Sequence, residues 1–524
     1  MSAIAFVRLA ELFAPLAHLL ASGGDTRLQL APETRLNGYG CRPYPRPEAF
    51  TFASSTATSI SERAFAAAER AREELLRAAL RRGLDDAFGA AVAALREDLA
   101  RLLGIDRSGA DIVFAPSGTD AALAALFLAR SLLGTPLTAV IAAADETGSG
   151  VALASAGRHF STLTAHGIAV EKGGPIAGLA DDVACRQVPL RGPGGAAPAA
   201  ADEAVMRAVA EAVAGGARVL LHVMDHSKLG ARCPSPDTIA AVERRFGASV
   251  QVVIDACQMR LSRARIAAHL ARGHLVLITG SKFMTGPPFS GAVLVPAALS
   301  ARMAAAPAAP SGLGDYSSRS DWPRAWSGIR ANLAERANMG QLLRWVAAAR
   351  EMRDYFAVPF AYRRQALAAF AARLPALLAA AGMEPFFDPV PPDAADEEMA
   401  VRTIFPFRPR RGGAFLTPAE CTVLYHALNQ DVAQLLPGLQ PGEDSLARQL
   451  CHIGQPVALA DGSAALRISA GARVVSETWS RRSEAASLAA LERELEQVRT
   501  ILAKTALLLP HLEHLAAARK AAAA

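Results

Sequence analysis

The stretch DIVFAPSGTDAALAALFLARSLL, residues 111–133, decides the fold because a short apolar run, a tight polar turn and an apolar helical run follow one another directly. The same succession recurs in LTAVIAAADETGSGVALASAGRHF, residues 137–160. Three further β-rich apolar runs end in polar turns: ARVLLHVMDHSKLG (217–230), SVQVVIDACQMRLS (249–262) and HLVLITGSKFMTGPPFSG (274–291). Strands that alternate with helices at this spacing predict an α/β fold with a mostly parallel sheet covered on both faces.

The polar turns of these units all follow strands. In an open parallel sheet, ligands bind outside the carboxyl ends of the strands. We therefore expect the turns to line one common site.

Composition narrows the class of protein. The chain has 524 residues, of which 52% are hydrophobic and 20% charged, so it can bury a large core and form more than one domain. The net charge is +6, but basic and acidic residues are interleaved without a long Lys/Arg run, so we expect neither a nucleic-acid nor a membrane partner. The six cysteines are scattered without a CxxC pair, which predicts reduced thiols in a cytoplasmic protein and no metal site.

Three parts are expected along the chain. Residues 1–50 form an N-terminal helix and an irregular arm, residues 51–310 the large α/β domain, and residues 311–524 a smaller α+β domain. The smaller domain is predicted to close with a helix from Ser483 to about Leu508. Residues 304–326 are predicted to form a long loop able to move over a site.

The apolar start IAFVRLAELFAPLAHLLA, residues 4–21, resembles the core of a signal peptide. However, Arg8 and Glu11 interrupt it and its apolar residues recur at helical spacing. We therefore predict an amphipathic docking helix and not a signal peptide or membrane span.

Three of the polar turns carry chemically distinctive residues. Ser117 to Asp120 (SGTD) open a helix, where backbone N–H groups bind phosphate, although Ser and Thr are also ordinary helix caps. Asp255 ends a buried strand, where a carboxylate needs a partner, and such an Asp often caps a turn. Lys282 ends another apolar strand; the alternatives there are a salt-bridged lysine and an amine with a lowered pKa that forms Schiff bases. Together, a phosphate cradle, a carboxylate for a pyridine nitrogen and a Schiff-base lysine are what pyridoxal phosphate requires.

The sequence resembles the class V aminotransferase and cysteine desulfurase family of fold-type I pyridoxal-phosphate enzymes. The resemblance runs from about Phe50 to about Thr478. It rests on five motifs in the family's order: ASSTATSIS (53–61), LREDLARLLGIDRSGADIVFAPSGTDAAL (95–123), VVIDACQ (252–258), TGSK (279–282) and ALRIS (465–469). It implies a large α/β domain with a seven-stranded, mostly parallel sheet, a smaller α+β domain, and a homodimer.

The resemblance also implies roles for individual residues. Lys282 would form the internal aldimine and shuttle a proton at the substrate's α-carbon, Asp255 would pair with the ring nitrogen, and Gln258 would contact the phenolic oxygen. The phosphate would be bound by residues of the SGTD turn and of TGSK: Ser117, Gly118, Thr119, Thr279 and Ser281. Arg467 would clamp the substrate carboxylate, and Thr58 of the first motif would also contact substrate.

The sequence departs from the family where desulfurases carry a histidine that stacks on the cofactor ring. Glu146, Thr147 or Gly148 of DETGSG stands there, and Glu146 either contacts the cofactor or substrate or caps the turn. His159 or His226 could replace the missing ring. Ser227 is nearest the position of a polar residue that contacts the cofactor.

Cys451 precedes Arg467 at a spacing like that of the nucleophilic cysteine in one branch of the desulfurases. A persulfide-forming thiol must be exposed, whereas a free cysteine is commonly a small core residue. Both interpretations of Cys451 stay open at this point.

The sequence thus predicts a pyridoxal-phosphate enzyme, of aminotransferase or lyase type, that acts on the amino group of a small amino acid. One alternative is a cysteine desulfurase or C–S lyase that uses Cys451. The other is a protein with the same fold and cofactor that binds or regulates without turnover.

Overall fold

The computed structural model describes residues 11–192, 195–387 and 396–523. Part of the predicted N-terminal helix, residues 4–10, lies outside this range. The described part is not one continuous helix: a 3-10 turn at Glu11–Phe13 is followed by α2 at Leu16–Leu20. Pro15 stands between them at the N-cap of α2, where its missing N–H and fixed φ end one helical segment and begin the next.

The predicted large, mostly parallel sheet is confirmed. It has seven strands in the order β2-β10-β9-β8-β7-β3-β4, and β10 is antiparallel to both of its neighbours. The remaining neighbours pair in parallel. The strands are β2 (Asp111–Ala115), β3 (Leu137–Ala142), β4 (Val183–Val188), β7 (Arg218–Met224), β8 (Val250–Asp255), β9 (Leu275–Thr279) and β10 (Gly291–Val295).

The two faces of this sheet belong to two separate hydrophobic clusters. Along β9, Leu275 and Leu277 join one cluster, while Val276 and Ile278 join the other. Side chains alternate between the faces of a strand, so strands that are apolar throughout must be covered on both sides. The continuous apolar runs of the sequence are explained by this double burial.

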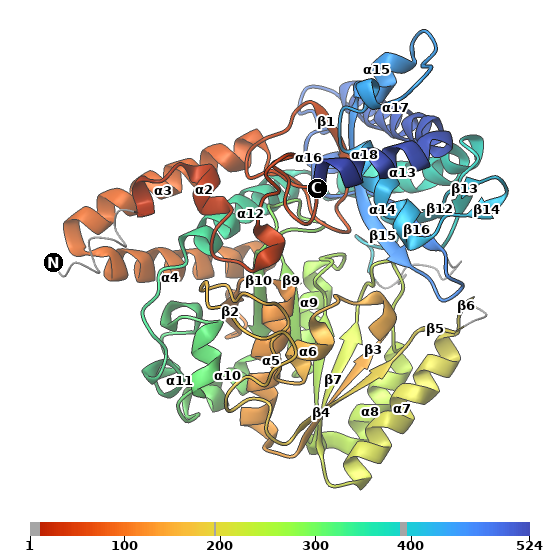
Figure 1. The fold of residues 1–524 in the computed structure, drawn as a ribbon. Coiled ribbons are helices and arrows are strands. Elements are labelled where there is room, and N and C mark those ends of the chain that lie inside the picture. Colours follow the sequence, from red (N-terminus) through yellow and green to blue (C-terminus); the bar gives the residue numbers. More distant parts are fainter. Residues whose placement is uncertain (1–10, 193–194, 388–395, 524) are drawn as a thin grey trace.

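Helices cover both faces (Figure 1). α5 (Gly118–Leu133) packs against β2, β9 and β10, and it is buried over most of its circumference, as its nearly all-apolar sequence requires. On the opposite face, α7 (Pro198–Ala214) packs on β3 and β7, and α8 (Pro236–Phe246) and α9 (Arg263–Ala271) pack on β8 and β9. The remaining helices near this sheet are α6 (Val151–Ser155), α10 (Ala297–Ala304) and α11 (Ser327–Ala331).

A second sheet of five strands lies beside the first, in the order β1-β15-β16-β12-β11. These strands are β1 (Ala49–Phe52), β11 (Glu384–Pro385), β12 (Ile404–Arg408), β15 (Leu450–Ala458) and β16 (Ala464–Ser469). β1 pairs in parallel with β15, so a strand from the start of the chain completes the C-terminal sheet. Two short hairpins complete the strands of the described residues: β5 (Arg191–Gly192) with β6 (Gly195–Ala196), and β13 (Arg410–Arg411) with β14 (Ala414–Phe415).

Long helices join and flank the two sheets (Figure 1). α12 (Met339–Ala357) packs against α3 (Glu62–Arg82), α4 (Leu84–Leu103) and α2. The predicted closing helix is confirmed as α17 (Glu484–Leu508), which Ser483 caps with its side chain. The other C-terminal helices are α13 (Phe360–Ala380), α14 (Pro418–Leu428), α15 (Glu443–Arg448), α16 (Ala472–Ser476) and α18 (Leu512–Ala523).

Residues 304–326 form a long, largely irregular segment, as predicted, but the segment packs against the large sheet and does not extend over a site. This segment forms short 3-10 turns that pack onto the α5 side of the large sheet. Trp322 and Trp326 are fully buried there, and Trp322 meets Phe127 of α5 edge to face at 5.4 Å. Burial of the two large indole rings stabilises the packed conformation, although the composition of the segment is typical of a loop. The core of the large sheet therefore extends past residue 310, the domain boundary expected from sequence.

Within the described ranges, no helix combines the length and apolar character that a membrane crossing requires.

Candidate active site

A pocket of about 340 Å³ lies where the carboxyl ends of the parallel strands face the second sheet. Its floor comes from turns that follow β3, β7, β8 and β9. Its other walls come from the N-terminal arm, the 55–56 turn after β1, and Gln455 and Arg467 of the second sheet. The predicted common site of the polar turns is thus one cavity.

The SGTD turn forms one end of this cavity. Ser117 is the N-cap of α5, and its Oγ accepts the N–H groups of Thr119 at 3.2 Å and Asp120 at 3.3 Å. A Cβ on Gly118 would stand 2.8 Å from Cys257 Sγ, so glycine is required for this close approach. The positive end of a long, buried helix therefore opens onto the pocket.

Asp255 and Gln258 lie on the turn after β8. Asp255 Oδ1 accepts the Cys257 N–H at 3.1 Å, and Oδ2 lies 3.5 Å from Thr147 Oγ1. Gln258 lines the pocket, but its Oε1 accepts from Arg260 at 2.7 Å and its Nε2 donates to the Ser55 carbonyl at 3.0 Å. Asp255 is therefore held by neutral donors, and Gln258 links the turn to the second sheet.

Lys282 is half-buried after β9 and lines the pocket. In the described part of the chain its side chain has neither a hydrogen bond nor an ion pair. Burial is the largest influence and lowers the pKa of Lys282; Arg467 and Arg260 lower it further, against Cys257 and Asp255. An amine in this setting loses its proton more readily than a surface lysine.

The turn that carries Lys282 is fixed at both ends. A Cβ on Gly280 would lie 2.4 Å from Ala348 Cβ of α12, so a larger residue would displace the helix. The Thr285 carbonyl accepts from Arg473 Nη2 at 2.6 Å and from Thr58 Oγ1 at 3.1 Å. Thr58 thus stabilises the turn through this hydrogen bond. It does not line the pocket, so its position does not support the predicted contact with substrate.

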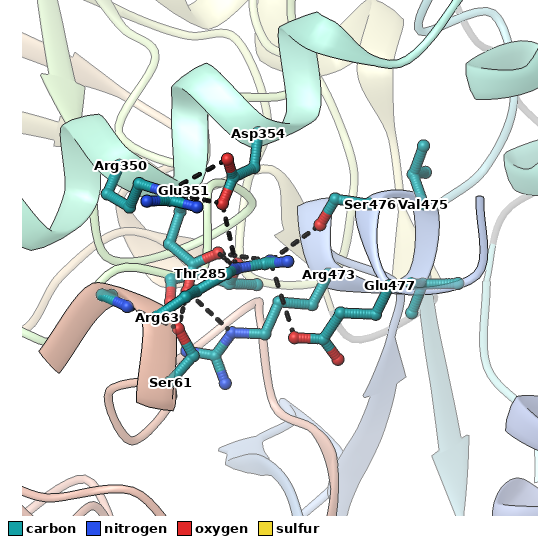
Figure 2. A network of polar contacts seen from close by, with 12 residues as sticks. Ser61, Arg63, Thr285, Arg350, Glu351, Asp354, Arg473, Val475, Ser476 and Glu477 are labelled. Atoms are coloured by element: carbon teal, nitrogen blue, oxygen red, sulfur yellow. Dashed lines mark hydrogen bonds and ion pairs between the residues drawn. The ribbon is translucent and has the colours of Figure 1, made fainter. Parts of the chain in front are cut away.

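A buried ion-pair network stands behind this turn (Figure 2). Glu351 of α12 is fully buried; it pairs with Arg473 of α16 at 3.2 Å and with Arg63 of α3 at 2.6 Å. Arg63 also lies 3.2 Å from Asp354. Three helices and the lysine turn are therefore joined through a single carboxylate.

Glu146 lines the pocket from the turn after β3, yet its carboxylate is already engaged. It forms an ion pair with Arg191 and accepts a hydrogen bond from Ser227. Burial raises the pKa of Glu146, while Arg191 and Ser227 oppose this shift. Ser227 also accepts the Leu229 and Ala231 N–H groups and is not among the pocket-lining residues, so its position serves the turn.

Arg467 reaches the pocket from β16, as expected. Its Nη2 donates to Thr56 Oγ1 at 2.9 Å and to the Gln455 carbonyl at 2.8 Å, and its Nη1 donates to the Lys228 carbonyl at 3.2 Å. These acceptors are neutral, and no carboxylate among the described residues pairs with Arg467. Burial lowers the pKa of Arg467 to about 10, while Tyr425 and Glu146 oppose this shift.

Cys451 does not reach the pocket. It lies on β15 with no exposed surface, and burial raises the pKa of its thiol to about 11. His159 is also absent from the lining and bonds to Tyr316 at 2.6 Å. His226 does line the pocket, with Nδ1 2.8 Å from Asp225 Oδ2.

The two remaining residues that were predicted to bind the phosphate are Thr279 and Ser281. Ser281 and Thr279 line the pocket beside the lysine, but Thr279 Oγ1 donates to the Cys257 carbonyl at 2.6 Å. Ser281 has no hydrogen bond of its side chain within the described ranges and stays available to a ligand.

Sequence reasoning assigned no individual residue of the N-terminal arm to the site. Arg27 and Tyr39 line the pocket; Arg27 pairs with Asp25 at 2.6 Å and donates to Ser117 Oγ at 3.3 Å. Its guanidinium lies 4.9 Å from the centre of the Phe289 ring. The arm has no motif of its own, so only its packing reveals that Arg27 places a further cation beside the start of α5.

Several residues around the same cavity have strained backbone conformations. Of the six non-glycine residues with left-handed φ in the described chain, four adjoin or line it: Ala143 (52°), Met259 (54°), Thr285 (56°) and Phe289 (69°). Such conformations persist where the surrounding structure imposes them, and they are common at functional sites.

No family model matches the chain, and no curated protein matches it either. Among solved structures, a NifS-like protein aligns at 12% identity over 86% of this chain and 99% of its own, with a TM-score of 0.46. Mouse CSAD in apo form aligns at 16% identity over 95% and 98%, with a TM-score of 0.48. Oryza sativa TDC with PLP and tryptamine aligns at 15% identity over 88% and 84%, with a TM-score of 0.47. At identities this low and TM-scores below 0.5, the function must be argued from the pocket.

Proposed function

We propose that this chain is a pyridoxal-phosphate enzyme that acts on the amino group of a small amino acid. The observation that carries this proposal is Lys282, whose amino group has no hydrogen bond or ion pair within the described ranges and shares one pocket with the start of α5 and with Asp255.

The residues fit the three parts of the cofactor. Lys282 would hold its aldehyde covalently, and Asp255 would hold its pyridine nitrogen in the protonated form. The N–H group of Gly118, with the hydroxyl groups of Thr119 and Ser281, would hold its phosphate. When bound, pyridoxal phosphate supplies an electron sink that stabilises negative charge at the substrate's α-carbon.

The chain's own groups would then move protons. The lowered pKa of Lys282 suits its amine to accept a proton at the α-carbon and return it. His226 is a second candidate, because Nδ1 donates to Asp225 Oδ2 at 2.8 Å and this fixes Nε2 as the nitrogen left to exchange a proton.

The reaction type is proposed as transamination or elimination. Desulfuration through Cys451 is not supported, because a persulfide-forming thiol must be accessible and Cys451 has no exposed surface. A homodimer is expected from the family resemblance, and light scattering on the purified protein tests it.

Visible absorption of the purified protein with pyridoxal phosphate tests the proposal. We expect a cofactor band that is removed by borohydride trapping, with mass added to the peptide that contains Lys282. Lys282→Ala should abolish the band and the labelled peptide, while Lys172→Ala, at an exposed lysine outside the pocket, should leave both unchanged. A wild-type protein that develops no such band would contradict the proposal, and a band without turnover on any amino acid would favour a binding or regulatory protein.

A further inference from the structure

A second lysine faces the same pocket. The chain contains only five lysines beside 50 arginines, yet both Lys228 and Lys282 line this cavity. Lys228 is half-buried, and in the described residues its ammonium group has no hydrogen bond and no ion pair. Its backbone N–H donates to the Glu146 carbonyl at 3.1 Å, which fixes the turn that carries it.

Lys228 stands beside Arg467. Arg467 Nη1 donates to the Lys228 carbonyl, so the two cations occupy adjoining walls of the pocket. All five N–H groups of Arg467 already have neutral acceptors, whereas the ammonium group of Lys228 has none. Of the two, Lys228 is the cation with open hydrogen-bonding capacity.

The acidic residues of the pocket cannot balance this charge. Glu146 and Asp255 are the two carboxylates among its described lining residues. Glu146 is paired with Arg191, and the proposed cofactor engages both Asp255 and Lys282. Arg27 is neutralised by Asp25. The phosphate of the proposed cofactor adds its negative charge at the start of α5. On the wall formed by Lys228 and Arg467, two positive charges therefore remain, while the α-carboxylate of an amino acid supplies only one negative charge.

We infer that the substrate is an acidic amino acid, whose side chain ends in an oxyanion such as a carboxylate, and that Lys228 binds this second anionic group while Arg467 exchanges some of its neutral acceptors for the α-carboxylate. This inference rests on the proposed function, since it assigns Lys282 and Asp255 to the cofactor. A charge-assisted hydrogen bond from a partly buried ammonium group favours an oxyanion over its neutral amide.

The titration of Lys228 agrees with this role. Burial, the largest influence, lowers the pKa of Lys228 to about 8 together with Arg467 and Lys282, while Glu146 opposes this shift. The group is therefore still charged at neutral pH, and an incoming anion would relieve both the desolvation and the repulsion.

The test measures binding of unreactive carboxylates to the holoenzyme by titration calorimetry. The probes are glutarate, which carries two carboxylates, and butyrate, which carries one. We expect wild-type protein to bind glutarate at least about 10-fold more tightly than butyrate. Lys228→Met should remove this preference by weakening glutarate alone, Lys228→Arg should retain it, and Lys172→Met should not alter either affinity.

Equal wild-type affinities for the two probes would overturn the inference without any variant having to fold. So would a Lys228→Met variant that weakens both probes alike, because Lys228 would then belong to a single carboxylate site. The visible cofactor band is recorded on the same samples. Its absence would count against the proposed function, whereas a normal band without glutarate preference would count against the acidic substrate alone.

Discussion

Replacing Glu351 with Gln should destabilise the protein strongly, although Glu351 lies outside the pocket. Its carboxylate is fully buried and bonds to Arg63 through Nη2 at 2.6 Å and Nε at 3.1 Å, and to Arg473 Nε at 3.2 Å (Figure 2). The amide keeps the volume but removes the negative charge, so two arginines lose their shared partner. Breaking a buried ion pair costs about 3–5 kcal/mol.

The expected loss lies at the lower end of this range, about 3 kcal/mol, because both arginines are partly exposed and Arg63 keeps Asp354 at 3.2 Å and Glu477 at 3.5 Å. Glu492→Gln is the matched control. Glu492 pairs with Arg373 at 2.6 Å, but both side chains are at least half exposed, so we expect a change of about 0–1 kcal/mol.

Urea unfolding followed by both tryptophan fluorescence and circular dichroism supplies the free energies, provided that the two signals change together. Arg473 Nη2 also donates to the Thr285 carbonyl, so the variant should bind pyridoxal phosphate more weakly as the lysine turn loosens. A Glu351→Gln protein within about 1 kcal/mol of wild type would refute the reasoning, because the carboxylate would then contribute no more than an exposed one.

Three further predictions follow from the contacts. Arg27→Leu removes a cation beside Ser117 and should raise the dissociation constant for pyridoxal phosphate about 10-fold in equilibrium dialysis. An unchanged dissociation constant would mean that Arg27 only holds the N-terminal arm in place and does not contribute to cofactor binding. Cys451→Ala should leave the cofactor band and the reaction products unchanged, since the thiol is buried on β15, whereas loss of sulfide release from cysteine would revive the desulfurase alternative. Burial lowers the pKa of His222 from 6.5 to about 4, so below pH 6.5 the unfolded chain binds a proton that the folded chain does not, and stability falls as the pH falls through this window. His222→Gln should flatten that decline in urea midpoints measured at stepped pH, and an unaltered slope would assign it to other groups.

Much of the large sheet was predictable because its strands are short apolar runs that are buried on both faces. Ser117, Asp255 and Lys282 each follow such a run, and the rule that carboxyl ends of parallel strands meet at one edge places them together. Ser483 as a helix cap and the closing helix are equally local signals.

Other features depend on contacts between distant segments. Residues 304–326 have the composition of a loop, and only the space beside α5 explains why Trp322 and Trp326 are buried. The exposure of Cys451 could not be inferred from its spacing to Arg467, since burial is set by the strands that cover it. Lys228 carried one usable signal, a rare lysine in a turn after a strand, but nothing in the sequence says that its charge lacks a partner.

The sequence by itself determined the α/β alternation, the order of the strand-end turns and the lysine, carboxylate and helix cap that they carry, because these follow from local periodicity and turn chemistry. The tertiary structure decided which charges are neutralised. It pairs Glu146 with Arg191 and Arg27 with Asp25, whereas Lys228 and Arg467 face one cavity and neither forms an ion pair within the described residues. Pairing of charges depends on distances of a few ångströms between segments far apart in the chain, and those distances exist only once the two sheets have packed.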